Sequence, residues 1–117
     1  MEEYFDIIKI VSNALSNLDV PTFEGWYDEE INKTHITFFE YLEAPEDFLD
    51  DEEVSIEHNV QVDIWTKDSL EGLELKNKVK RLLKHNGFLL EDSNDQYETD
   101  TGIYHKAMRF NYSEDLD

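Results

Sequence analysis

Cysteine is absent from this chain of 117 residues, and glycine and proline are scarce, with four and two copies. Without cysteine the chain can form no disulfide, no thiolate zinc site and no cysteine nucleophile. The four glycines are scattered, which excludes a glycine-rich loop that binds phosphate. No apolar run approaches the roughly 20 residues of a membrane-spanning helix. The first ten residues are acidic, whereas a secretory signal begins with basic residues. These absences favour a reducing, cytoplasmic setting and no membrane.

Basic residues are also few: 10 Lys and Arg face 29 Asp and Glu, giving a formal net charge of -19. Phosphate should repel such a chain, so tight binding to nucleic acid is not expected. The charge is unevenly distributed. Seven of the eleven residues in 43–53 are acidic, and five of the ten basic residues lie within 76–84. An acidic surface can serve solubility alone, but segregated charge also suits a molecule that docks in one orientation.

Aromatic residues are plentiful, with seven Phe, six Tyr and two Trp. Disordered chains combine high charge with few aromatics, so this composition favours a folded protein. A chain of this length is expected to form a single domain over residues 1–117 and to bury a core of its own.

Two segments, 3–18 and 68–86, carry the 3.6-residue periodicity of amphipathic helices. Asp68 is a suitable N-cap with Glu71 three residues later, and Gly87 suits the left-handed position after a helix. The predicted buried faces are Tyr4, Ile7, Ile8, Val11, Leu15 and Leu18 in the first helix, and Leu75, Val79, Leu82 and Leu83 in the second.

Alternating apolar and polar residues predict four strands, over 34–42, 54–65, 88–91 and 103–112. Between them we expect an irregular segment or short strand at 22–32, an acidic loop at 43–53, a polar connection at 92–102 and a frayed tail at 113–117. The order α-β-β-α-β-β predicts an α+β fold: a single two-layer domain with a four-stranded, mostly antiparallel sheet and two helices packed on one face.

The strand 54–65 is the longest of the four and would span roughly 40 Å. One end is therefore expected to project as part of a hairpin with 34–42. Its even face should pack under the helices, with His58 as the polar exception; this face holds Val54, Ile56, Val60, Val62 and Ile64. Its odd face should be left uncovered by the helices; this face holds Ser55, Glu57, Asn59, Gln61 and Asp63.

Catalytic templates are lacking, including the GxSxG nucleophile elbow. His35, His58 and His105 lie on predicted strands and could meet across the sheet, where Asp63 or Glu57 would complete a metal site. No local HxH or HxxxH pair supports this, so structural histidines are the expectation. The acidic loop lacks the glycine and ligand spacing of an EF-hand. The sequence therefore predicts no catalytic residue, no cofactor and no metal.

Two surfaces are candidates for partner contacts. The first is the partner-contact segment Phe48, Leu49, Asp50, Asp51, Glu52 and Glu53, whose apolar pair either folds onto its own sheet or anchors a partner. The second is the basic face of the second helix, formed by Lys76, Lys80, Arg81 and Lys84. It is either an ordinary solvated face or a docking face for the acidic loop of a neighbouring copy.

Several ordered stretches carry a family resemblance: VQVDIWTKD at 60–68, KVKRLLKHNGF at 78–88 and YETDTGIYHKAMRFNY at 97–112. THITFFEYLEAP at 34–45 and the acidic DDEEV at 50–54 fit the same pattern. Over residues 20–112 the chain resembles the tail terminator or tail-completion proteins of long-tailed bacteriophages and prophages, also called tail-to-head joining proteins. The extreme acidity departs from the family pattern and leaves the partner surfaces open.

The resemblance implies a non-enzymatic α+β virion protein with no catalytic residue to carry over. Such proteins form a hexameric ring, although a single copy can be monomeric in isolation. The implied partners are the major tail tube protein and a head-completion or neck protein, and DNA passes through the ring without sequence-specific binding. The implied location is the head–tail junction of the virion, after synthesis in the cytoplasm of the bacterial host. Extended hairpins belong to the family's joining surfaces, and 43–53 is the matching position.

Three alternatives stay open from the sequence. One is another neck component, of the head-completion or stopper type. A second is a small enzyme or metal-binding module that uses His35, His58 and His105. A third is an inhibitor that mimics DNA, which would carry regularly spaced carboxylates on an outer helix face; the outer face of 68–86 is basic instead.

Overall fold

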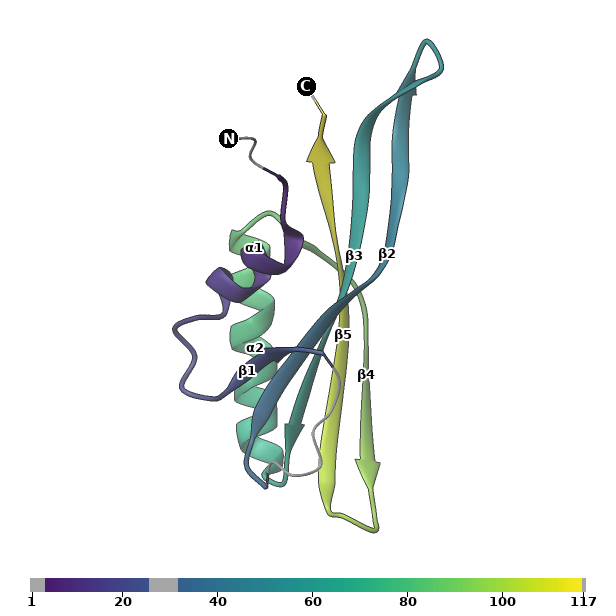
Figure 1. Cartoon of the computed structure of the whole chain (residues 1–117). Coiled ribbons are helices and arrows are strands. Elements are labelled where there is room, and N and C mark those ends of the chain that lie inside the picture. Colours follow the sequence, from purple (N-terminus) through teal and green to yellow (C-terminus); the bar gives the residue numbers. More distant parts are fainter. Residues whose placement is uncertain (1–3, 26–31, 117) are drawn as a thin grey trace.

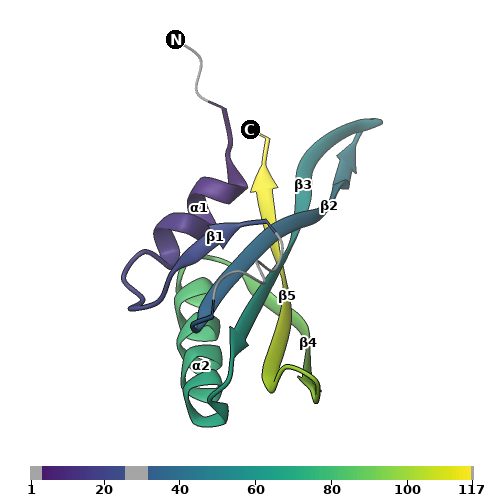
Figure 2. The same ribbon diagram turned by 60° about the horizontal axis from the view of Figure 1, so that its bottom comes forward.

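The computed structural model describes residues 4–25 and 32–116 of the chain, which form one sheet with both helices on the same face (Figure 1). The sheet has five strands in the order β1-β2-β3-β5-β4. A second view shows the same two layers from another direction (Figure 2). The elements in chain order are α1 (Ile7–Ala14), β1 (Thr22–Glu24), β2 (His35–Leu49), β3 (Glu52–Thr66), α2 (Ser69–His85), β4 (Leu89–Glu98) and β5 (Ile103–Asp115).

The fold is α+β, but the predicted four-stranded, mostly antiparallel sheet is wrong because the sheet is five-stranded and mixed. The additional strand is β1, which pairs in parallel with β2 from Thr22 opposite Ile36 to Glu24 opposite Phe38. Three residues are too few for an alternating pattern to emerge from the sequence. The prediction allowed a short strand in 22–32, and the remainder of that range, 26–31, lies outside the described residues.

The predicted acidic loop at 43–53 is also wrong, because these residues extend two strands. β2 continues to Leu49, β3 begins at Glu52, and these two residues are paired. Only Asp50 and Asp51 form the turn, with φ angles of 52° and 66°. Pairing between β3 and β5 starts only at Ser55, so the tip of the hairpin extends beyond the sheet, as the long arm in Figure 1 shows.

The last two strands are longer than predicted as well. β4 runs to Glu98 rather than ending at 91, and residues 99–102 make the turn to β5. Every residue of β4 is exposed. Because no face of this strand packs in the core, its sequence does not need the apolar alternation from which the strands were predicted. β5 ends at Asp115, so the residues from 113 to 115 are paired rather than frayed.

The core lies between the sheet and the helices, where the predicted even face of β3 is buried from His58 to Ile64, whereas Val54 and Ile56 are only partly buried. Val60, Val62 and Ile64 are fully enclosed, and their neighbours on β5 are Phe110, Met108 and Lys106. The helices contribute their predicted apolar residues, namely Ile7, Val11 and Leu15 from the α1 segment and Leu75, Val79 and Leu83 from α2. Burying side chains of this size contributes about 1.5–3 kcal/mol each.

The helix limits follow from their caps. Asp68 caps α2 as predicted, since its carboxylate accepts hydrogen bonds from the backbone N–H groups of Leu70 and Glu71 at 3.0 and 3.1 Å. Gly87, with φ 93°, ends that helix as predicted. Asp6 caps α1, so the first helix is shorter than the predicted 3–18. Tyr4 therefore precedes the helix and is 83% exposed rather than buried.

The Asp50-Asp51 turn generates a prediction about the hairpin. A two-residue turn with positive φ at both positions favours Asn-Gly, because other residues meet a steric cost there. We expect Asp50→Asn combined with Asp51→Gly to stabilise the tip by roughly 1 kcal/mol, measured as slower amide hydrogen exchange at the tip by NMR. The matched control is Glu52→Gln with Glu53→Gln, which removes the same charge without changing the turn. Equal slowing in both variants would attribute the effect to charge and contradict the backbone explanation.

Candidate functional site

The tip of the β2–β3 hairpin exposes an apolar pair. Phe48 and Leu49 are 63% and 67% exposed, so they do not fold back onto their own sheet. The turn residues Asp50 and Asp51 and the first two residues of β3 are exposed as well, which brings all six candidate partner-contact residues together at one end of the molecule. We call the set Phe48, Leu49, Asp50, Asp51, Glu52 and Glu53 the hairpin tip.

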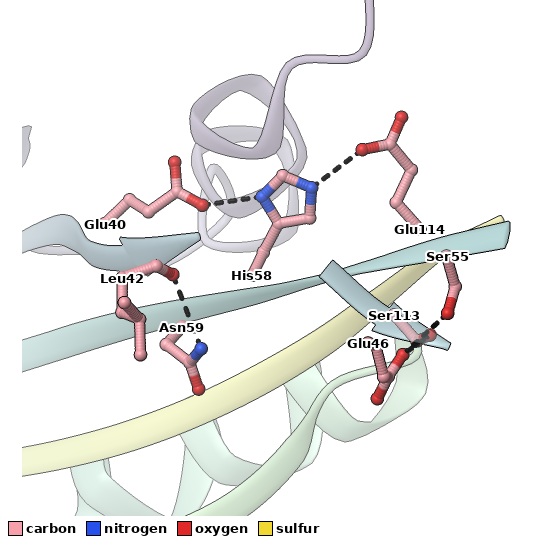
Figure 3. A network of polar contacts seen from close by, with 8 residues as sticks. All are labelled: Glu40, Leu42, Glu46, Ser55, His58, Asn59, Ser113 and Glu114. Atoms are coloured by element: carbon pink, nitrogen blue, oxygen red, sulfur yellow. Dashed lines mark hydrogen bonds and ion pairs between the residues drawn. The ribbon is translucent and has the colours of Figure 1, made fainter. Parts of the chain in front are cut away.

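The root of the hairpin holds a buried histidine between two carboxylates (Figure 3). His58 is 4% exposed and lies on the face of β3 that the helices cover. Its Nδ1 is 2.6 Å from Oε2 of Glu40 on β2, and its Nε2 is 2.8 Å from Oε1 of Glu114 on β5. Phe5 stacks on the imidazole ring at 4.8 Å between ring centroids. The three side chains therefore link three adjacent strands.

This arrangement favours the protonated imidazole. Burial by itself lowers the pKa of His58, because it disfavours the charged ring. The hydrogen bonds to Glu114 and Glu40 and the charges of both carboxylates outweigh burial and raise the pKa above its ordinary 6.5. Only an imidazolium can donate from both ring nitrogens at once, which matches a carboxylate on each side.

The opposite face of the hairpin root is tied by a separate set of hydrogen bonds. The Ser55 hydroxyl on β3 donates to Oε1 of Glu46 and Oδ2 of Asp47, both at 3.2 Å. The Ser113 hydroxyl on β5 also donates to Glu46. Figure 3 shows Glu46, Ser55 and Ser113 of this set beside the His58 network. Because the root is held on both faces, the arm leaves the sheet in a defined direction.

The sheet face opposite the helices carries a second polar cluster. The ring of His105 stacks on Trp65 at 3.8 Å between centroids, and its Nε2 is 2.7 Å from Oδ1 of Asp63. The Trp65 indole N–H donates to the Thr37 hydroxyl at 2.9 Å. The odd residues of β3 do face away from the helices, but Ser55, Asn59 and Asp63 are only 2–3% exposed because other side chains enclose them.

The three histidines proposed for a shared metal site do not meet. His58 lies on the helix-covered face of the sheet, whereas His105 and His35 lie against Trp65 on the opposite face. The sheet separates the two groups. This geometry contradicts the site formed by His35, His58 and His105 with Asp63 or Glu57.

One member of the predicted basic face is engaged within the chain. Lys76 donates to Asp95 on β4 at 3.2 Å, and Lys106 donates to the same carboxylate at 3.1 Å. Burial raises the pKa of Asp95, but the two lysines outweigh it and the net shift is downward. Lys76 therefore pairs with a carboxylate of its own chain. Lys80, Arg81 and Lys84 are the members of the predicted basic face that are left on the outside of α2.

Sequence reasoning missed the partners of His58, namely Glu40 and Glu114. The available signal was the isolated histidine among β-branched residues on the even face of β3, since a buried polar group requires partners. Which carboxylates would supply them depends on the register of β2 and β5, and carboxylates are too numerous in this chain to be singled out.

Comparison with the families of known proteins and with curated proteins finds no match to this chain. The resemblance to tail terminator proteins therefore stays a prediction. None of the helices in the described part of the chain is long and apolar enough to cross a membrane.

The His58 network leads to a prediction on pH. Since its pKa is raised in the folded protein, the stabilisation is complete below the unfolded value of about 6.5 and is lost as pH rises through the folded value. We expect His58→Gln to lower the free energy of unfolding by about 1–3 kcal/mol at pH 6 and by less at pH 9. Urea unfolding of both proteins in a metal-free buffer measures this. Parallel pH curves for the two proteins would contradict it.

Proposed function

We propose that this chain is a non-enzymatic structural protein of a bacteriophage virion, a tail terminator that caps the tail tube and joins it to the neck. It acts as a ring, six copies by the family resemblance, through which DNA passes without sequence-specific contacts. Its partners are the major tail tube protein and a head-completion protein at the head–tail junction, and it is made in the cytoplasm of the bacterial host. The sequence resemblance and the projecting hairpin support this proposal.

The observation that carries the proposal is the exposed apolar pair at the end of a projecting arm. Exposed large apolar side chains on a projecting arm are candidates for a protein contact. Phe48 and Leu49 are consecutive in β2, so they present one apolar side chain on each face of the hairpin. Phe48 and Leu49 are both more than three-fifths exposed, at 63% and 67%. Burying such side chains in a partner would contribute about 1.5–3 kcal/mol each. The ties on both faces of the root reduce the entropy lost when the arm docks.

The charges suggest how neighbouring copies are arranged. The acidic hairpin tip and the basic residues Lys80, Arg81 and Lys84 belong to different surfaces of one chain. A contact between unlike surfaces of identical chains is heterologous, and it generates a closed ring when the rotation between copies closes. In our proposal the tip of one copy approaches α2 of the next, and electrostatics sets the orientation.

Removing the apolar pair tests the capping role. We expect Phe48→Gln with Leu49→Gln to leave the fold intact but to abolish the arrest of tube growth when the protein is added to polymerising tail tube protein. Electron microscopy of tube lengths measures this. The matched control is Leu70→Gln with Leu73→Gln, which removes two exposed leucines, 64% and 50% exposed, from α2.

Each outcome of the capping experiment has a defined meaning. Wild-type protein that leaves tube growth unchanged would contradict the terminator proposal, and binding to filled heads instead would indicate a head-completion protein. Capping that survives in the hairpin variant but fails in the α2 variant would place the contact surface on the helix.

Neutralising the acidic tip tests its electrostatic role. We expect the fourfold variant Asp50→Asn, Asp51→Asn, Glu52→Gln and Glu53→Gln to fold normally but to assemble more slowly, with a weaker dependence on salt, because exposed charges act mainly through screened attraction. The control neutralises four exposed carboxylates elsewhere, at Asp19, Glu74, Asp92 and Asp100. Normal infectivity of phage carrying the tip variant would contradict an electrostatic role of the hairpin tip in assembly.

A further inference from the structure

The root of the hairpin brings metal-ligating atoms together on the helix-covered face of the sheet. One ligand atom from each of Glu40, Glu43 and His58 lies within 4.8 Å of the other two. The three residues differ in exposure: His58 is buried, Glu40 is partly buried and Glu43 is exposed. The cluster is thus open to solvent on the side of Glu43.

A β-bulge in β2 produces this cluster. In a regular strand Glu40 and Glu43 would point to opposite faces, because side chains alternate. The register shifts between Glu40 and Leu42, so that Glu40 is opposite Val60 while Glu43 is opposite His58. Val60 and His58 share the helix-covered face of β3, and both glutamates therefore face the same side. Bulges commonly re-aim side chains in this way next to functional sites.

Glu114 completes the arrangement from the other side of the ring. It lies 2.8 Å from Nε2 of His58, the nitrogen that faces away from Glu40. A histidine that binds a metal through one nitrogen usually donates its other N–H to a carboxylate, which fixes the tautomer and orients the ring. With the proton held on Nε2, Nδ1 is the nitrogen that offers its lone pair on the side of Glu40.

We propose that Glu40, Glu43 and His58 bind a zinc-class divalent ion, with Glu114 as the positioning residue for His58. Zinc bonds to nitrogen and oxygen are about 2.0–2.2 Å, so tetrahedral ligand atoms lie roughly 3.4 Å apart. All three ligand atoms lie within 4.8 Å of one another, and the hydrogen-bonded pair of Glu40 and His58, at 2.6 Å, has to open by about 0.8 Å to reach this spacing when an ion replaces the proton. One imidazole and two carboxylates suit zinc, and the imidazole disfavours magnesium and calcium, which prefer oxygen ligands alone.

The ion replaces the Nδ1 proton of His58 and adds positive charge among the surrounding carboxylates. Without it, one imidazolium faces the carboxylates of Glu40, Glu43 and Glu114. A divalent ion with a neutral imidazole adds one further positive charge to the cluster. It also bonds β2 directly to β3 at the point where the arm leaves the sheet. The site does not depend on the proposed tail function.

Calorimetry on the full chain tests the site. Chelator-treated protein is titrated with zinc chloride at pH 7.5 in a large excess of Mg²⁺, which occupies weak carboxylate sites on this acidic surface. We expect one equivalent of zinc to bind per chain, with affinity reduced at least about tenfold by Glu43→Gln. Glu114→Gln should weaken binding by about tenfold, in the range typical of a carboxylate that orients a ligand.

The control is Glu57→Gln, which removes a carboxylate from the position next to His58 but on the opposite face of β3. It should bind zinc as the wild type does, and zinc should raise the melting temperature of both proteins but not that of Glu43→Gln. Since Glu43 is exposed, its variant is expected to fold, and circular dichroism checks this. Absence of saturable zinc binding, or equal affinity of the Glu43 and Glu57 variants, would overturn the proposal.

Discussion

Strand β3 pairs with a neighbour on each side and places the apolar side chains of Val60, Val62 and Ile64 under the helix layer, and the other elements depend on this arrangement. Val60, Val62 and Ile64 are fully buried, while Gln61 and Asp63 point to the face that the helices leave uncovered. A shift by one residue would exchange the two sets, because strand side chains alternate with a period of two. Burial of the apolar set therefore fixes which face of β3 lies against the helices. It also fixes which face of the hairpin root receives the side chain at position 58.

The parts of the fold that could be predicted are those in which side chains specify the structure. The periodicity of α2, its Asp68 cap and its Gly87 end were sufficient to place that helix to within a residue at each end. The extensions of β2 beyond residue 42 and of β4 beyond residue 91 could not be predicted. Both are exposed, and their hydrogen bonds come from the backbone, which carries no sequence signal. A high density of carboxylates indicates solvent exposure, but it does not distinguish a loop from an edge strand or a projecting hairpin.

The candidate site was only half visible in the sequence for a related reason. The hairpin tip could be named because Phe48 and Leu49 stand out among acidic neighbours, and their exposure then followed from the length of the arm. The cluster at the root depends on a single irregularity, the register shift after Glu40, and on the pairing of His58 with Tyr112 that places Glu114 nearby. Both are consequences of tertiary pairing. The isolated histidine on an apolar face indicated that partners were required, but it could not identify them.

The net charge of -19 gives a reason for the two sets of polar contacts at the root of the arm. Seven carboxylates lie between residues 43 and 53, and the repulsion among them opposes a compact arm, although the register places no two of them directly opposite each other. An acidic arm that projects from the sheet therefore needs ties where it leaves the domain. The His58 network supplies positive charge on the helix-covered face, and the Ser55 and Ser113 hydroxyls supply donors on the other. With the direction of the arm fixed at its root, the exposed apolar pair is held away from the core, which is the geometry that our proposed partner contact requires.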